Sequence, residues 1–228
     1  MSQLNSRIRP QITDFKDDGF SKHLSGKKVI VTAGGTREAI DEVRFIGNRS
    51  SGRMGLEIAK AARDAGASVK LIACNLETTP AGMEVVHVTS VDELEQAMDH
   101  PADAIAMAAA VSDFRVRNPY LGKLSRSQTP NLDLVPTKDL IASYCAKYPK
   151  SFAVAFTLSD DKKNLESVSK KKLWDKGVAL MVGNTTEALG SDTTAVLLVS
   201  RESVTEHEGP KSKVAKLIVE AITNHFVH

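Results

Sequence analysis

Several features are scarce in this chain of 228 residues, and each scarcity excludes a class of protein. The two cysteines, Cys74 and Cys145, lie far apart and form no C-x-x-C motif, which argues against a zinc site or a disulfide framework and favours reduced, buried thiols. No apolar stretch approaches the roughly 20 residues of a membrane span, and the N-terminus is too polar for a signal sequence. We therefore expect a cytoplasmic protein with no membrane partner.

The net charge is also small, at +2, and the lysines and arginines are spread along the chain. Bulk electrostatics therefore do not suggest a nucleic-acid partner, and any bound anion is expected to be small. The hydrophobic fraction of 42% and the charged fraction of 25% are those of an ordinary globular protein, so one domain is the expectation.

The chain from Lys27 onward alternates short β-branched runs with helical patterns. KKVIVTA, SVKLIAC and MEVVHV predict strands, and helices are expected over about 54–64 and in VDELEQAMDH. ADAIAMAAAV is an uninterrupted apolar run, as in a strand buried on both faces of a parallel sheet. Residues 1–26 show little periodicity and are expected to be a tail or linker, which leaves 27–228 as the domain.

The remaining elements complete a three-layer, doubly wound, mostly parallel α/β fold of Rossmann-like type. The segment FRVRNPYLGKLSRSQTPNLDLVP, which holds three prolines, predicts a flap at about 115–135 after the central strand. Helix KDLIASYCAKY, strand SFAVAFT, a lysine-rich helix over about 160–176 and strand VALMVGN follow. AVLLVSRESVTEHEG predicts a C-terminal β-hairpin, and KSKVAKLIVEAITNHF a closing amphipathic helix.

A glycine-rich segment follows the first predicted strand. Gly34 and Gly35 stand at the carboxyl edge of the sheet, where a dinucleotide-binding fold carries G-x-G-x-x-G and then a helix at once. Here residues 38–52 are expected to form a long loop before the helix begins. The fingerprint is therefore broken, which argues against an NAD(P)-dependent oxidoreductase.

The stretch GNRSSGRMG has the spacing of a phosphate-binding P-loop but not its chemistry. Arg53 and Met54 stand where that motif requires a lysine and a hydroxyl. Backbone amides at the helix N-terminus, with Ser50 or Ser51 as the N-cap, are expected to form an anion site. A plain turn and helix cap is the alternative.

Together with three later segments, the run VTAGGTREAIDEVRFIGNRSSGRMG resembles the phosphopantothenoylcysteine synthetase family, the phosphopantothenate-cysteine ligases of coenzyme A biosynthesis. The later segments are AAAVSDF, Gly122-Lys123-Leu124 in the flap, and AFT followed downstream by Lys172, Lys176 and VGN. The resemblance covers roughly residues 27–225. Because several motifs occur in the family's order, the match is more specific than any single motif.

This resemblance implies a stand-alone, homodimeric ligase that joins phosphopantothenate to L-cysteine. A nucleoside triphosphate first converts the carboxylate to an acyl-nucleotidylate with loss of pyrophosphate, and the cysteine amine then displaces the nucleotide. The family implies Mg²⁺ and a nucleotide, for which we favour CTP with ATP as the alternative, and no FMN. An NAD(P)-dependent oxidoreductase and a non-catalytic nucleotide- or pantothenate-binding homologue remain as rival hypotheses.

The resemblance also implies site residues. Asn48 is expected to hold the acyl-nucleotidylate and its carbonyl, and Lys123 to close over the phosphates; both are the expected catalytic residues, and Lys123 also counts as nucleotide-binding. Arg44 is expected to reach the substrate phosphate of a neighbouring subunit, although a surface ion pair with Asp41 or Glu42 is the alternative. The other expected substrate-binding residues are Ala109, Ala110 and Asp113. The other expected nucleotide-binding residues are Gly34, Gly35, Ser50, Gly52, Gly55, Asp113, Asp139, Phe156, Lys172, Lys176 and Asn184.

Two departures from the family's pattern bear on these roles. Leu124-Ser125-Arg126 follows the flap lysine where further lysines are usual, so the triphosphate is expected to be gripped differently. Residues 156–160 read FTLSD in place of a FAAET-like stretch, and this is why the nucleotide preference stays open. Mg²⁺ is expected, but the residues that bind it are left unassigned.

Overall fold

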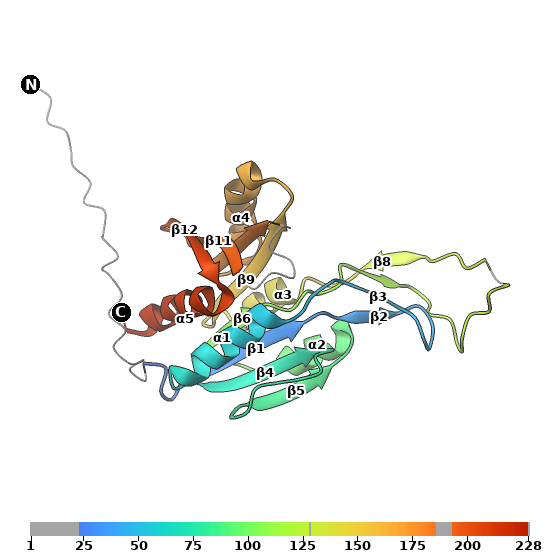
Figure 1. Cartoon of the computed structure of the whole chain (residues 1–228), viewed down its shortest axis with the longest axis horizontal. Coiled ribbons are helices and arrows are strands. Elements are labelled where there is room, and N and C mark those ends of the chain that lie inside the picture. Colours follow the sequence, from blue (N-terminus) through green and yellow to red (C-terminus); the bar gives the residue numbers. More distant parts are fainter. Residues whose placement is uncertain (1–22, 128, 186–192, 228) are drawn as a thin grey trace, which may run out of the picture.

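The predicted strands assemble into one mixed sheet flanked by helices (Figure 1). The computed structural model describes residues 23–127, 129–185 and 193–227. Its elements, in chain order, are β1 (Lys28–Gly34), β2 (Arg37–Ala39), β3 (Phe45–Gly47), α1 (Arg53–Asp64), β4 (Ser68–Cys74), β5 (Glu84–Val88), α2 (Val91–Met98), β6 (Ala104–Met107), β7 (Phe114–Val116), β8 (Leu134–Pro136), α3 (Leu140–Lys147), β9 (Phe152–Ser159), α4 (Lys162–Lys176), β10 (Leu180–Thr185), β11 (Thr193–Val199), β12 (Val204–Pro210) and α5 (Lys211–Val227).

The sheet has eight strands in the order β12-β11-β10-β9-β6-β1-β4-β5. The strands from β10 to β5 pair in parallel, and β11 and β12 form the expected antiparallel hairpin. Beyond β1 the chain builds outward to β5, then returns to the other side of β1 with β6. The strand order therefore reverses between β1 and β6, and in such sheets ligands bind beyond the carboxyl ends of the strands at this point. The predicted doubly wound, mostly parallel fold is confirmed.

Two hydrophobic clusters cover the two faces of the sheet. Val29 and Val31 of β1 pack into the cluster that includes α1 and α5, whereas Ile30 packs into the cluster that includes α2, α3 and α4. Side chains of a strand alternate between faces, so a strand with helices on both faces must be apolar at successive positions. This explains the uninterrupted apolar run of β6, whose four residues are all buried. The result is the expected three-layer arrangement.

Two hairpins project together from the sheet and form what we call the arm (Figure 1). One is the β2–β3 hairpin, and the other is the flap, residues 115–135, whose ends pair as β7 and β8. The expectation of a loop over residues 38–52 was wrong in part, because β2 and β3 pair antiparallel within it. These strands have only three residues each, so they depend on packing against the neighbouring flap. Local sequence patterns do not reveal such a contact between distant segments.

The packed domain begins earlier than Lys27. Leu24 is fully buried in the cluster with α1 and α5, and its backbone N–H donates to the carbonyl of Ala65 at 3.0 Å. The expected tail was thus drawn too long at its C-terminal end; residues 1–22 of it lie outside the described residues. Within the described parts of the chain, no helix is both long and apolar enough to cross a membrane.

Candidate functional site

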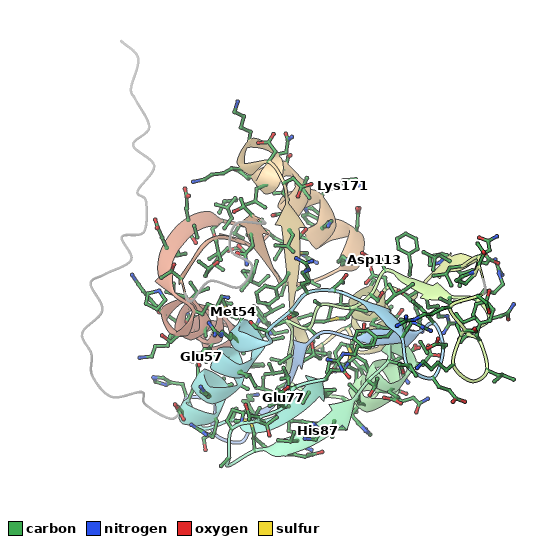
Figure 2. The ribbon with its side chains drawn as sticks, turned by 45° about the vertical axis from the view of Figure 1, so that its right-hand side comes forward. Met54, Glu57, Glu77, His87, Asp113 and Lys171 are labelled. Carbon is green, nitrogen blue, oxygen red and sulfur yellow. The ribbon has the colours of Figure 1, made fainter. Side chains whose placement is uncertain are left out.

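A cavity of about 1090 Å³ opens at the carboxyl ends of β6, β9 and β10, beside the point where the strand order reverses. We call it the main cavity. Figure 2 labels two residues of its lining, Met54 in the first turn of α1 and Asp113 at the base of the arm. Most of the predicted site residues line it: Asn48, Ser50, Gly52, Ala109, Ala110, Asp113, Asp139, Phe156, Lys172, Lys176 and Asn184. Segments far apart in the sequence thus meet in one place.

The loop after β3 brings Asn48 to the main cavity. Its side-chain Nδ2 donates to the carbonyl of Val111 at 2.8 Å, so the amide is held against the end of the central strand. The two backbones approach closely nearby, where Gly35 and Ala110 form a parallel bridge. A Cβ on Gly35 would lie 3.0 Å from the carbonyl oxygen of Asn48. Packing therefore positions Asn48 while its amide group stays solvent-accessible.

The helix cap differs from the prediction. The N-cap of α1 is Gly52, in the left-handed region at φ 69°, and no side chain caps the helix. Ser50 instead accepts a hydrogen bond from the Gly52 N–H at 3.2 Å. A Cβ at Gly52 would lie 2.9 Å from the backbone nitrogen of Gly34, so neither the conformation nor the space suits another residue. Ser50 and Ser51 remain available to a ligand as cavity-lining residues.

Two buried threonine hydroxyls hold the AAAVSDF turn. The hydroxyl of Thr32 accepts from the N–H of Ala109 at 3.1 Å, and that of Thr36 accepts from the N–H of Ser112 at 2.9 Å. Ser112 in turn donates to the carbonyl of Phe114 at 2.8 Å. The turn is thus tied both to β1 and to the segment that follows it, and Asp113 is left exposed at the cavity.

The opposite wall of the main cavity carries the lysine pair. Lys172 donates to the Thr157 hydroxyl at 2.8 Å, and Lys176 forms an ion pair with Asp139, the N-cap of α3. The two lysines lie on one face of α4, as their spacing predicts. Asn184 at the end of β10 completes the wall, and its Oδ1 is buried without a hydrogen-bond partner in the described residues. A buried acceptor of this kind suits a ligand N–H group.

Four of the predicted residues lie outside the main cavity and outside the smaller one described below: Gly34, Gly55, Arg44 and Lys123. Gly55 has a structural explanation, because a Cβ there would lie 2.6 Å from the Cβ of Ala33 and 2.8 Å from the Thr32 carbonyl. Its role is therefore the close packing of α1 on β1. Arg44 and Lys123 both belong to the arm. Arg44 lies between β2 and β3, and Lys123 lies in the flap.

Arg44 forms the ion pair with Asp41 that was the alternative to a substrate contact. Asp41, however, is not a surface residue, since its side chain is fully buried. Burial opposes its ionisation, but hydrogen bonds from the N–H groups of Val43, Arg44 and Leu124, and from the Arg44 guanidinium, outweigh this and lower the pKa of Asp41 to about 2. The carboxylate therefore stays ionised at neutral pH and links both hairpins of the arm.

A second, smaller cavity of about 260 Å³ was not predicted. We call it the small cavity. It shares Asn48, Arg49 and Ser50 with the main cavity, and its other walls are Gly35, Arg37, Phe45, Gly47 and Asn75. Sequence reasoning missed Arg37 and Arg49 because they sit within glycine-rich motifs as unremarkable cations. It missed Asn75 because only the pairing of β1 with β4 brings the residue after β4 beside Gly35.

Comparisons with known proteins identify the family of this chain. A family model described as DNA/pantothenate metabolism flavoprotein C-terminal domain matches residues 24–226. A protein named coenzyme A biosynthesis bifunctional protein CoaBC, from Thermococcus kodakarensis, is 38% identical over 79% of this chain and 47% of its own length. A Mycobacterium bovis protein of the same name is 36% identical over 91% of this chain and 54% of its own.

A solved structure of the same kind of protein has a similar fold. A crystal structure of the C-terminal domain of a CoaBC protein is 28% identical, with a TM-score of 0.74, and covers 90% of this chain and 98% of that one. The chain spans about half the length of the curated relatives it matches. In one CoaBC protein, the C-terminal domain that this chain matches was solved as a separate structure.

Proposed function

The chain belongs to the family of the DNA/pantothenate metabolism flavoprotein C-terminal domain, and on that basis we propose that it is a cytoplasmic phosphopantothenate-cysteine ligase of coenzyme A biosynthesis. One observation carries the proposal. The main cavity joins Asn48, an amide donor suited to an acyl carbonyl, with Lys172 and Lys176, cations suited to a triphosphate. Relatives named for coenzyme A biosynthesis support the choice of substrates.

In the first step, a carboxylate oxygen of phosphopantothenate attacks the α-phosphorus of the nucleotide. The bond from that phosphorus to the bridging oxygen breaks, and pyrophosphate leaves with the electron pair. Two anions must approach each other, so cations and N–H donors lower the barrier. Lys172 and Lys176 are proposed to bind the departing phosphates, and the amides of the loop before α1 the α-phosphate.

In the second step, the cysteine nitrogen attacks the acyl carbon. A C–N bond forms, the bond from carbon to the nucleotide oxygen breaks, and the nucleoside monophosphate takes the electron pair. The nitrogen gives up two protons as the ammonium group becomes an amide. Asn48 Nδ2 is proposed to donate to the oxyanion of the tetrahedral intermediate, a role that needs no particular protonation state.

Mg²⁺ would neutralise charge on the triphosphate, and the cavity offers a suitable donor set. Asp113 lines the cavity, and no ion pair of its carboxylate occurs in the described residues; Asp139 lines it beside Lys176. No cluster of three or more potential protein ligands occurs in the regions that the structure describes. Mg²⁺ commonly binds one or two carboxylates together with nucleotide phosphates, so Asp113 and Asp139 fit that mode.

We propose a homodimer that associates through the arm. The arm carries large apolar side chains that are at least 45% exposed, namely Val43, Phe45, Leu121 and Leu134, and Phe114 at the start of β7 is equally exposed. An apolar patch of this kind typically marks an interface. Arg44 and Lys123 also lie on the arm and line neither cavity, so a partner subunit would give them a place at a reaction site.

Pyrophosphate release tests the function directly. Purified protein is mixed with phosphopantothenate, Mg²⁺, and CTP or ATP in parallel, with and without L-cysteine. We expect release with CTP, with ATP as the alternative nucleotide, and phosphopantothenoylcysteine when cysteine is present. Absence of pyrophosphate with both nucleotides would overturn the ligase proposal. Ligand binding without release would identify a non-catalytic homologue instead.

A further inference from the structure

The small cavity adjoins the proposed reaction centre without belonging to the nucleotide site. It shares Asn48, Arg49 and Ser50 with the main cavity and extends from them toward the β2–β3 hairpin and Asn75. The nucleotide wall, with Phe156 and the lysine pair, lines only the main cavity. A ligand in the small cavity therefore lies next to Asn48 and apart from the proposed leaving nucleotide.

The charge of the small cavity is entirely positive. Arg37 and Arg49 line it, and no acidic residue does. Neither arginine has an ion pair within the described residues, whereas Arg44, Arg115 and Arg117 of the arm each pair with an aspartate. Arg37 lies over the ring of Phe45, with its Cζ 4.6 Å from the ring centroid, and this cation–π contact favours that position of the guanidinium. Guanidinium groups pair geometrically with carboxylates and phosphates.

Asn75 adds an acceptor to the same cavity. Both hydrogens of its side-chain amide are committed, because Nδ2 donates to the carbonyls of Gly35 at 2.8 Å and Thr89 at 3.1 Å. Only its Oδ1 can serve a ligand, and an oxygen acceptor suits an amine or ammonium group. Asn75 is also the one non-glycine residue with positive φ in the described chain, at 52°, a left-handed conformation that asparagine tolerates better than most residues.

The size of the cavity limits the ligand. Its volume of about 260 Å³ corresponds to roughly eight or nine water molecules at about 30 Å³ each, enough for a small amino acid but not for a nucleotide. A ligand with one carboxylate and one amine matches the two arginines and the acceptor of Asn75. The proposed reaction has one such substrate.

Resting on the proposed ligase function, we propose that the small cavity is the binding site of the amino-acid co-substrate. Arg37 and Arg49 bind the α-carboxylate of L-cysteine, and Asn75 Oδ1 accepts from its nitrogen. The nitrogen then faces the acyl carbon at Asn48 from the side opposite the leaving nucleotide. Arg37 and Arg49 would thereby select an amino acid over a simple amine.

Comparing cysteine with cysteamine, which lacks the carboxylate, tests this assignment. The wild-type chain, Arg37→Met and Arg49→Met are assayed with both amines, and KM is measured for each substrate. We expect each variant to raise KM for cysteine about tenfold, as for a lost charged hydrogen bond, and to leave KM for cysteamine close to the wild-type value. The ratio of KM for cysteamine to KM for cysteine then falls by the same factor.

Arg201→Met is the matched control, because Arg201 is also exposed and lies over an aromatic ring, that of Trp174, at 4.8 Å. It is expected to keep the wild-type preference. An unchanged preference in both Arg37→Met and Arg49→Met would overturn the proposal. A rise in KM for phosphopantothenate instead would assign the arginines to the substrate phosphate. Lack of pyrophosphate release by the wild-type chain would contradict the ligase function itself, so the two failures are distinguishable.

Discussion

The carboxylate of Asp41 accepts a hydrogen bond from the backbone N–H of Leu124 at 3.1 Å, and this bond joins the β2–β3 hairpin to the flap. The same carboxylate accepts from the N–H groups of Val43 at 2.8 Å and Arg44 at 2.6 Å. Arg44 and the residue next to Lys123 are therefore held by one buried group. We infer that the two arm residues expected at the reaction site are positioned as a unit.

Asp41→Asn should loosen the arm. Asparagine keeps the shape of the side chain but loses its charge. Its NH₂ group is a donor and cannot accept the hydrogen bonds that the second carboxylate oxygen of Asp41 accepts. We expect amide hydrogen exchange over residues 120–126 to accelerate about tenfold or more, and ligase activity to fall with it. Exchange followed by mass spectrometry measures the first effect.

Asp133→Asn is the control for this variant, since it removes an exposed ion pair with Arg117 from the same flap. Exposed pairs contribute little to stability, so exchange over residues 120–126 should stay near the wild-type rate. Equal acceleration in both variants would show that Asp41 has no special role.

The arm should also respond to acid. The pKa of Asp41 in the folded protein is about 2, below its ordinary value of 3.8, so the ionised carboxylate stabilises the arm above about pH 4. That contribution is lost as the pH falls from about 4 to about 2. We expect cleavage of the flap by pepsin to increase across this window. Asp41→Asn, which cannot titrate, should be cleaved readily throughout; a parallel increase in both proteins would assign the transition to other groups.

Asn48→Asp tests the proposed oxyanion donor. The two side chains are isosteric, but a carboxylate cannot donate and repels a developing negative charge. Product formation should fall by about 10²- to 10³-fold, the usual effect of removing such a donor, while pyrophosphate release without cysteine persists. Rapid-quench assays separate the two steps. Asn224→Asp, an exposed position on α5, is the control; wild-type turnover by Asn48→Asp would refute the role.

Lys176→Met should weaken nucleotide binding. Lys176 lines the main cavity, so its loss removes a cation from the proposed triphosphate site and leaves Asp139 without its ion pair. We expect KM for the nucleotide to rise about tenfold. Lys171→Met, on the same helix (Figure 2), is the control. Lys171 pairs with Asp175 and does not line the cavity. Equal KM values for the two variants would contradict the assignment.

Gly55→Ala should destabilise the fold. The added Cβ would lie 2.6 Å from the Cβ of Ala33, so α1 must move away from β1. Overpacking of this kind typically costs about 1–3 kcal/mol of unfolding free energy, measurable by urea denaturation. Ser51→Ala, in the exposed loop before α1, should change that free energy by less than about 0.5 kcal/mol. A neutral Gly55→Ala variant would show that the helix adjusts at no cost.

Sequence patterns by themselves determined the layers and the position of the main cavity. The apolar periods of β1, β4 and β6 are local properties of the chain, and a parallel sheet with helices on both faces follows from them. The strand pattern places ligands at the carboxyl edge of the sheet, but Asn48, Asp113 and Phe156 were expected together because of the family resemblance. All three line the main cavity.

Only the tertiary structure decided the rest, because it depends on contacts between segments distant in sequence. The short β2 and β3 strands depend on the flap, and Asp41 becomes a buried junction only when Leu124 reaches it. The small cavity exists because the end of β4 lies beside the loop after β1. Gly52 replaces a serine as the helix cap because the backbone of Gly34 leaves no room for a side chain.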